Sequence, residues 1–119
     1  RIGYENVVGF ISDLQDWQDK KELNYIESIY PSAINENENN IFILDVRKES
    51  ELQLGFVHDS INIPLSQLLF SLDKIPKNAN IIIYCAGGYR SMIASSILKS
   101  KGFKHIKNVY GGYNEIARN

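Results

Sequence analysis

The amino-acid sequence predicts an α/β domain in which helices alternate with the strands of a mostly parallel sheet. Two apolar runs, residues 41–46 and 81–84, have the length and composition of strands buried on both faces, which is typical of parallel sheets. Segments with helical spacing of apolar residues stand between the runs and are bounded by Gly, Pro and Asn. The 119 residues suffice for one domain with its own core.

The individual elements follow from short local patterns. Runs rich in β-branched and aromatic residues predict strands at residues 25–29, 41–46, 61–63, 81–84 and 106–109. Apolar spacing and terminal glycines predict helices or helical turns at residues 12–22, 49–54, 65–72, 91–102 and after 111–112. In the helix expected at 91–102, one face is apolar and Gly102 is the expected C-cap. In the first helix, Leu14 and Trp17 form a short packing stripe.

Composition excludes several classes of partner. The net charge is −1, from 13 basic and 14 acidic residues, so neither a nucleic acid nor an anionic membrane surface is expected as partner. No apolar run reaches the length of a membrane span. The one cysteine forms no internal disulfide, and no Cys/His spacing suits zinc, so no cofactor is expected in this domain. A lone functional thiol suits a reducing cytoplasm.

The residues most informative about chemistry are 81–98, a buried strand, a glycine loop and a helix start. Gly87 and Gly88 permit backbone angles that let consecutive amides converge on one point as an anion nest. The helix N-terminus and Arg90 add positive charge, so a thiolate at Cys85 is expected to be stabilised. The alternatives are a structural cysteine that ends a strand and, for Arg90, a surface salt bridge.

Three motifs in this order make the chain similar to the rhodanese family. They are LDVRKESELQLGFVHDSINIPL at 44–65, CAGGYRS at 85–91 and NVYGGY near the end, and the resemblance covers about residues 25–117. It implies a three-layer sandwich with a roughly five-stranded parallel sheet and helices on both faces. It also implies a sulfurtransferase that carries sulfane sulfur as a persulfide of Cys85.

The resemblance further implies a role for each residue of the loop. Cys85 is the nucleophile, and Arg90 either points its charge at the pocket or braces the loop. The backbone amides of residues 86–91 would hold the transferred sulfur, and the Tyr89 ring would stand at the pocket mouth. The substrate-binding residues are then Ala86, Gly87, Gly88, Tyr89 and Ser91.

Other residues are expected to be structural. Asp45 and Arg47 would tie the second strand to neighbouring loops. Residues 56–60, FVHDS, depart from the family's His-Ile-Pro-Gly-Ala, so we expect an altered loop with activity retained. His58 is expected to be a solvated loop residue and His105 a surface residue.

Two other function classes remain open. A phosphatase or arsenate reductase of the same fold needs a wider loop, with five residues between cysteine and arginine in the related phosphatases, whereas this chain has four. It also needs a general acid, and no Asp lies on the loop. The other class is a non-catalytic sulfur-binding or regulatory module, but such family members usually lack the cysteine.

The N-terminal stretch suggests a fusion. The chain begins at Arg1 rather than Met, and residues 3–10 echo residues 102–112, so we expect residues 1–22 to be a linker or the tail of a preceding module and 23–119 to be the domain. The stretch is similar to the junction in metallo-β-lactamase-fold proteins fused to rhodanese domains, of the persulfide dioxygenase type. This resemblance implies small sulfur donors and acceptors, a role in sulfide detoxification, and an iron held by the other domain.

Overall fold

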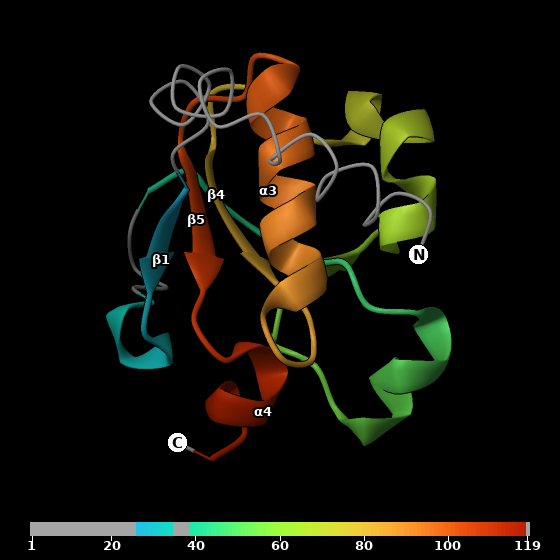
Figure 1. Cartoon of the computed structure of the whole chain (residues 1–119), viewed down its shortest axis with the longest axis vertical. Helices are drawn as coiled ribbons and strands as arrows, with labels where there is room; N and C mark the ends of the chain where they lie inside the picture. Colours follow the sequence, from blue (N-terminus) through green and yellow to red (C-terminus); the bar gives the residue numbers. More distant parts are fainter. Residues whose placement is uncertain (1–25, 35–38, 119) are drawn as a thin grey trace, which may run out of the picture.

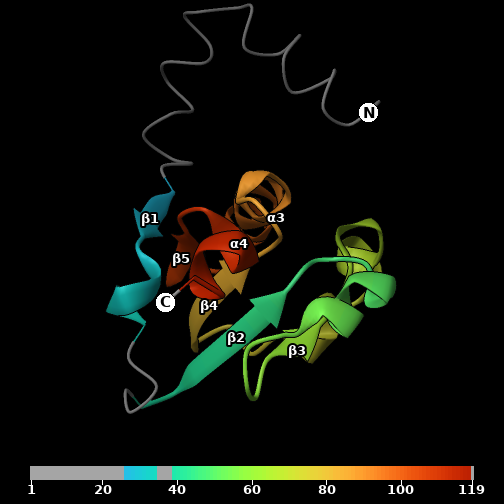
Figure 2. The same cartoon turned by 90° about the horizontal axis from the view of Figure 1, so that it is seen from below.

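Five parallel strands form one sheet in the computed structural model, which describes residues 26–34 and 39–118. Their order across the sheet is β1-β5-β4-β2-β3, seen end-on in Figure 2. The strands are β1 (Glu27–Ile29), β2 (Ile41–Asp45), β3 (Ile61–Asn62), β4 (Asn80–Tyr84) and β5 (Ile106–Val109).

The sheet is buried on both faces at its centre, because β4 lies between β5 and β2. Ile83 stands in register with Leu44 on one side and with Asn108 on the other. Alternate residues of the central strands β2 and β4 therefore face two separate core clusters. The continuous apolar runs at 41–46 and 81–84 thus identified the central strands correctly.

The larger core cluster lies between the sheet and helix α3 (Tyr89–Ser100), with the 3₁₀ turns η3 (Leu65–Phe70) and η4 (Leu72–Lys74) beside it (Figure 1). The opposite face carries the smaller cluster of Ile43, Ile82, Tyr84 and Val109. Tyr113 and Ile116 of α4 (Gly112–Ile116) pack there, as does Ile34 just after η1 (Pro31–Ala33). The three-layer α/β architecture is therefore confirmed.

A buried ion pair fastens β2 to the loop that follows it. The side chains of Asp45 and Arg47 are 0% and 1% exposed and lie 2.8 Å apart. Arg47 also donates to the carbonyl oxygens of Gly55, at 2.7 Å, and of Glu51, at 3.4 Å. The pair ties β2 to the 3₁₀ turn η2 (Glu49–Leu54), the structural role predicted for these two residues.

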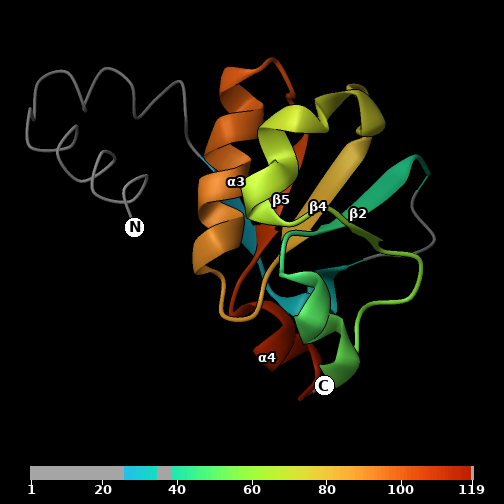
Figure 3. The same ribbon diagram turned by 90° about the vertical axis from the view of Figure 1, so that its right-hand side faces the viewer.

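Three connecting segments meet at the carboxyl edge of the sheet. The loop after β4, η2 after β2 and α4 after β5 all lie at the lower end of the molecule in Figures 1 and 3. Parallel α/β sheets place their ligand sites at this edge. The topology therefore brings three segments that are distant in sequence to one location.

Most predicted elements are present, with shifted boundaries. The long helix ends at Ser100 with Lys101 as its C-cap, so the prediction of Gly102 as the C-cap was wrong by one residue. The long helix begins at Tyr89 rather than at residue 91, because Gly88, at φ 100°, is its N-cap. The helix predicted at 12–22, including Leu14 and Trp17, lies outside the described residues. None of the described helices is long and apolar enough to cross a bilayer.

Candidate active site

Cys85 is the first residue after β4, and its sulfur accepts two backbone hydrogen bonds. The amide nitrogen of Gly88 lies 3.1 Å from Sγ and that of Ser91 lies 3.3 Å away. The positive φ of Gly88 folds the chain back over Cys85 and starts α3 at once. The loop therefore aims N–H dipoles inward at one sulfur atom.

Fewer amides donate to the sulfur than the set predicted from residues 86–91. The hydrogen bonds to Sγ come from Gly88 and Ser91, whereas Tyr89 and Arg90 form the first turn of α3. The N-terminus of this 12-residue helix faces the sulfur, so its dipole adds to the two hydrogen bonds. The positive ends of these dipoles therefore all point at Sγ.

Helix α4 fixes the loop from the other side. The amides of Tyr113 and Asn114 donate to the carbonyl oxygens of Cys85, at 2.6 Å, and of Ala86, at 2.9 Å. These bonds hold the two carbonyls away from the sulfur. A side chain at Gly112 would collide with both oxygens. The closing motif NVYGGY thus acts as a brace for the loop.

A polar chain runs from the sulfur toward β1. The Cys85 sulfur lies 3.5 Å from Ser91 Oγ, which donates to Oδ1 of Asn108 on β5. Asn108 in turn donates to Ser28 Oγ at 3.3 Å. Because Ser91 and Asn108 are buried, these bonds satisfy polar atoms that would otherwise be costly beneath the loop.

Arg90 links the start of α3 to η2, which agrees with a bracing role and also with the alternative of a salt bridge near the surface. Its guanidinium makes a two-bond ion pair with Glu51 of η2, at 2.8 and 3.0 Å. The hydrogen bond from Arg90 lowers the pKa of Glu51 to about 2, and Glu51 raises the pKa of Arg90 above its usual value. The side chains are 30% and 25% exposed, so this pair is partly shielded from water.

Two ion pairs adjoin each other at the site. Burial lowers the pKa of Arg47, but the hydrogen bond and charge of Asp45 outweigh it and raise that pKa above its usual value. Arg47 also hydrogen-bonds the backbone of Glu51, which holds Arg90. The four residues carry two positive and two negative charges, so their sum is zero.

The sulfur lies at the bottom of the loop. Cys85 is 1% exposed, whereas Tyr89 is 54% exposed and Gly87 is also exposed. Ala86 is half-buried. The Tyr89 side chain therefore lies at the surface beside the loop, and a reactant must pass between loop residues to reach Sγ.

The altered segment 56–60 packs against β4 rather than entering the loop. The Tyr84 hydroxyl accepts from the Val57 amide at 3.0 Å and lies 3.3 Å from Ser60 Oγ.

The His58 side chain is 86% exposed and His105 is exposed, so both surface predictions are confirmed. The described residues contain no group of three His, Cys, Asp or Glu placed to hold a metal ion.

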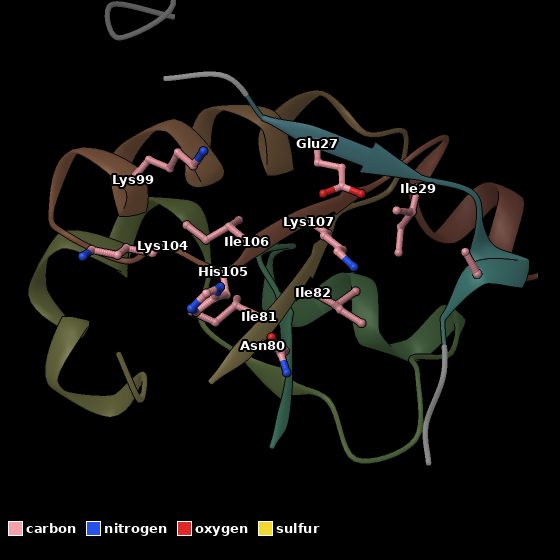
Figure 4. Close-up of a pocket in the computed structure, with 11 residues that line it drawn as sticks. Glu27, Ile29, Asn80, Ile81, Ile82, Lys99, Lys104, His105, Ile106 and Lys107 are labelled. Carbon is pink, nitrogen blue, oxygen red and sulfur yellow. The ribbon is translucent and has the colours of Figure 1, made fainter. Parts of the chain in front are cut away.

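A cavity of about 280 Å³ lies elsewhere on the molecule (Figure 4). Its walls come from β1, η1, the start of β4, the end of α3 and the residues around β5, and none belongs to the loop 85–91. Glu27 and Lys107, which stand in register on neighbouring strands, face it. The cavity is therefore separate from the cysteine site.

Sequence reasoning missed Glu51, Asn108 and Gly112 as contributors to this site. Glu51 and Asn108 lie 39 and 17 residues from their partners Arg90 and Ser91, so local patterns do not pair them. One signal was available for Glu51, because the motif at 44–65 includes an acidic position there. Gly112 lies in the motif NVYGGY, but the sequence does not show that it packs against the carbonyl oxygens of Cys85 and Ala86.

The sequence profile of the Rhodanese-like domain matches residues 28–119. A sulfurtransferase from Allochromatium vinosum is 30% identical over 78 residues, covering 66% of this chain and 73% of that protein. A rhodanese-related protein from Thermoplasma volcanium superposes with a TM-score of 0.71 at 33% identity, covering 77% of this chain and 91% of that one. A tRNA uridine(34) hydroxylase from Buchnera aphidicola is 35% identical over 89 residues, and the match covers 70% of this chain but only 28% of that relative's length.

Proposed function

Because the chain belongs to the Rhodanese-like domain family, we propose that it transfers sulfane sulfur through a persulfide on Cys85. The observation that carries this proposal is the pair of inward amides, from Gly88 and Ser91, on a single sulfur atom. Oriented dipoles of this kind stabilise charge without reorganising during the reaction. The resemblance to a sulfurtransferase supports the same activity.

The reaction needs two displacements and no redox cofactor. In the first, the Cys85 thiolate attacks the outer sulfur of the donor, a new S–S bond forms, and the donor departs with the electron pair of the broken bond. In the second, an acceptor such as cyanide, sulfite or a thiolate attacks the outer sulfur of the persulfide. The electron pair of that S–S bond returns to Cys85, so atoms and electrons balance.

The loop would serve both states of the cysteine. The amides of Gly88 and Ser91, which donate to Sγ, would hold the charge of the thiolate, and the N-terminus of α3 would favour negative charge on the carried sulfur. Low exposure of Cys85 shields the thiol itself from solvent. Arg90, fixed by Glu51, keeps the first turn of α3 in place.

One observation favours a second candidate, a non-catalytic sulfur-binding or regulatory module. Cys85 is 1% exposed, which a structural cysteine would also show. We favour the enzyme because a structural cysteine has no need of two inward amides and a helix N-terminus. The phosphatase reading is less favoured, since only four residues separate Cys85 from Arg90.

The biological setting is also part of the proposal. We propose that thiosulfate and low-molecular-weight persulfides are the candidate donors, and that the relative use of the two depends on the charges of the site. We also propose a fused upstream metallo-β-lactamase-fold domain, a role in sulfide detoxification, and a cytoplasmic location. Relatives that extend far beyond the matched region are consistent with a fusion. The sequence of the full-length gene product tests the fusion, and a different upstream domain would contradict it.

The activity is tested by Cys85→Ser, with Ser96→Ala on the exposed side of α3 as the control. Sulfur transfer to cyanide is followed as thiocyanate. We expect transfer by the chain and by the control, and none by Cys85→Ser, whose thermal unfolding should be unchanged. Equal transfer by Cys85→Ser would refute the role of the cysteine.

A further inference from the structure

The charges around Cys85 have a consequence for the choice of donor. Resting on the sulfurtransferase activity proposed above, we infer that the site selects sulfane-sulfur donors with at most one negative charge. Alkyl persulfides and organic thiosulfonates are of this class, whereas thiosulfate is a dianion. Glu51 is the residue that sets the preference, because it neutralises Arg90.

Arg90 is the only basic residue within the loop 85–91. Both oxygens of the Glu51 carboxylate bind it, at 2.8 and 3.0 Å, in the planar two-bond geometry that suits a guanidinium. Its charge is therefore paired before any donor arrives. The loop itself then offers a donor backbone dipoles but no unpaired cation.

The next arginine does not replace Arg90. Arg47 is 1% exposed and is bound to Asp45 through three contacts of 2.8 to 3.2 Å. Its remaining hydrogen bonds go to backbone oxygens of Glu51 and Gly55. The four charged residues of this network thus sum to zero, and each of its two arginines is paired within it.

The attacking group is itself an anion. A thiolate repels a dianionic donor twice as strongly as a monoanionic one at the same distance, because Coulomb energy scales with the product of the charges. Amides from Gly88 and Ser91 are already directed at Sγ. An unpaired Arg90 would offset the second negative charge of thiosulfate. Because the Glu51 carboxylate neutralises Arg90, that compensation is absent.

The test compares two donors that differ by one charge, thiosulfate and methanethiosulfonate, with cyanide as acceptor. We expect the unaltered chain to show a kcat/KM at least about tenfold higher for methanethiosulfonate. Glu51→Gln keeps a hydrogen-bonding oxygen for Arg90 but removes the negative charge. It should raise kcat/KM about tenfold for thiosulfate and about threefold for methanethiosulfonate, because the effect scales with donor charge.

Two further variants make the result decisive. Glu49→Gln removes the same charge from an exposed position of η2, and it should leave the donor ratio unchanged. Gly87→Lys adds a cation at an exposed loop position whose nearest outside atom lies 4.0 Å from the new Cβ, so it should favour thiosulfate even if Glu51→Gln fails to fold.

The outcomes separate this inference from the proposed function. Thiosulfate used as well as methanethiosulfonate by the unaltered chain would overturn the inference and leave sulfur transfer standing. An unchanged donor ratio in folded Glu51→Gln, or in Gly87→Lys if the former does not fold, would also overturn it. Absence of transfer from either donor would instead overturn the proposed function, and the inference with it.

Discussion

Gly112 packs so closely against Cys85 that a β-carbon at Gly112 would collide with the Cys85 carbonyl oxygen. The same atom would lie 2.7 Å from the carbonyl oxygen of Ala86. Both oxygens are backbone atoms that hydrogen-bond to α4, so neither can rotate away. The geometry of the sulfur loop is therefore set by a glycine 27 positions later in the chain, between β5 and the body of α4.

Gly112→Ala is expected to displace the loop and to lower sulfur transfer about 100-fold or more, because small misplacements of reacting groups have effects of that order. Gly102→Ala is the matched control, since Gly102 also has a positive φ but meets only the flexible end of Lys77. The control should lose about 1 kcal/mol of unfolding free energy and keep its activity. Equal activity in the two variants would contradict the bracing role of α4.

The Glu51–Arg90 pair makes stability depend on pH in the acid range. The pKa of Glu51 falls from 4.5 to about 2 on folding, so the pair stabilises fully above pH 4.5 and is lost as pH falls toward 2. Because Glu51 is partly exposed, we expect about 1–2 kcal/mol from it at neutral pH. Chemical denaturation from pH 6 to 2 should show a shallower decline in Glu51→Gln than in Glu49→Gln, and parallel declines would contradict this.

The buried Asp45–Arg47 pair is expected to matter for stability. Arg47→Met leaves the Asp45 carboxylate buried without its partner, which should lower the unfolding free energy by about 3–5 kcal/mol. The double variant Asp45→Leu/Arg47→Met removes both charges and should regain part of that loss. Urea denaturation measures both, and a double variant less stable than Arg47→Met would contradict this account of the pair.

The departure from the family pattern at 56–60 is predicted to be architectural. Tyr84→Phe removes the hydroxyl that accepts from the Val57 amide and contacts Ser60, and it should reduce stability by about 1–2 kcal/mol. Burial raises the pKa of Tyr84, so the hydroxyl stays protonated throughout the neutral range. Sulfur transfer should remain within about twofold, as measured by thiocyanate formation, and a large loss would place this segment in the site instead.

The central strands were predictable because a short, continuous run of apolar residues is enough to indicate a strand buried on both faces. Residues 81–84 are uninterrupted Ile and Tyr, and such a run has few alternatives to a strand covered on both faces. The start of α3 was less predictable, because a glycine in a loop does not by itself say where the following helix begins. The structure shows that Gly88 has a positive φ and is the N-cap. The prediction that Cys85 lies at the candidate site needed only the sequence of the loop 85–91.

The partners of the loop were not predictable from local patterns. The motif at 44–65 contains acidic residues, but it does not say that Glu51 is the one of 14 that binds Arg90, because that choice depends on where η2 lies beside α3. The same holds for Asn108, which reaches Ser91 from the neighbouring strand. Direct donation to sulfur by Gly88 and Ser91, rather than by all the loop amides, follows from backbone angles that composition does not reveal.

Mass spectrometry of the intact chain after incubation with a sulfane-sulfur donor and removal of excess reagent tests the central claim most directly. The account predicts that the mass of the chain rises by one sulfur atom, that cyanide reverses the gain, and that the gain is absent in Cys85→Ser. An unchanged mass in the folded chain with every donor, or a gain that persists in Cys85→Ser, would contradict it.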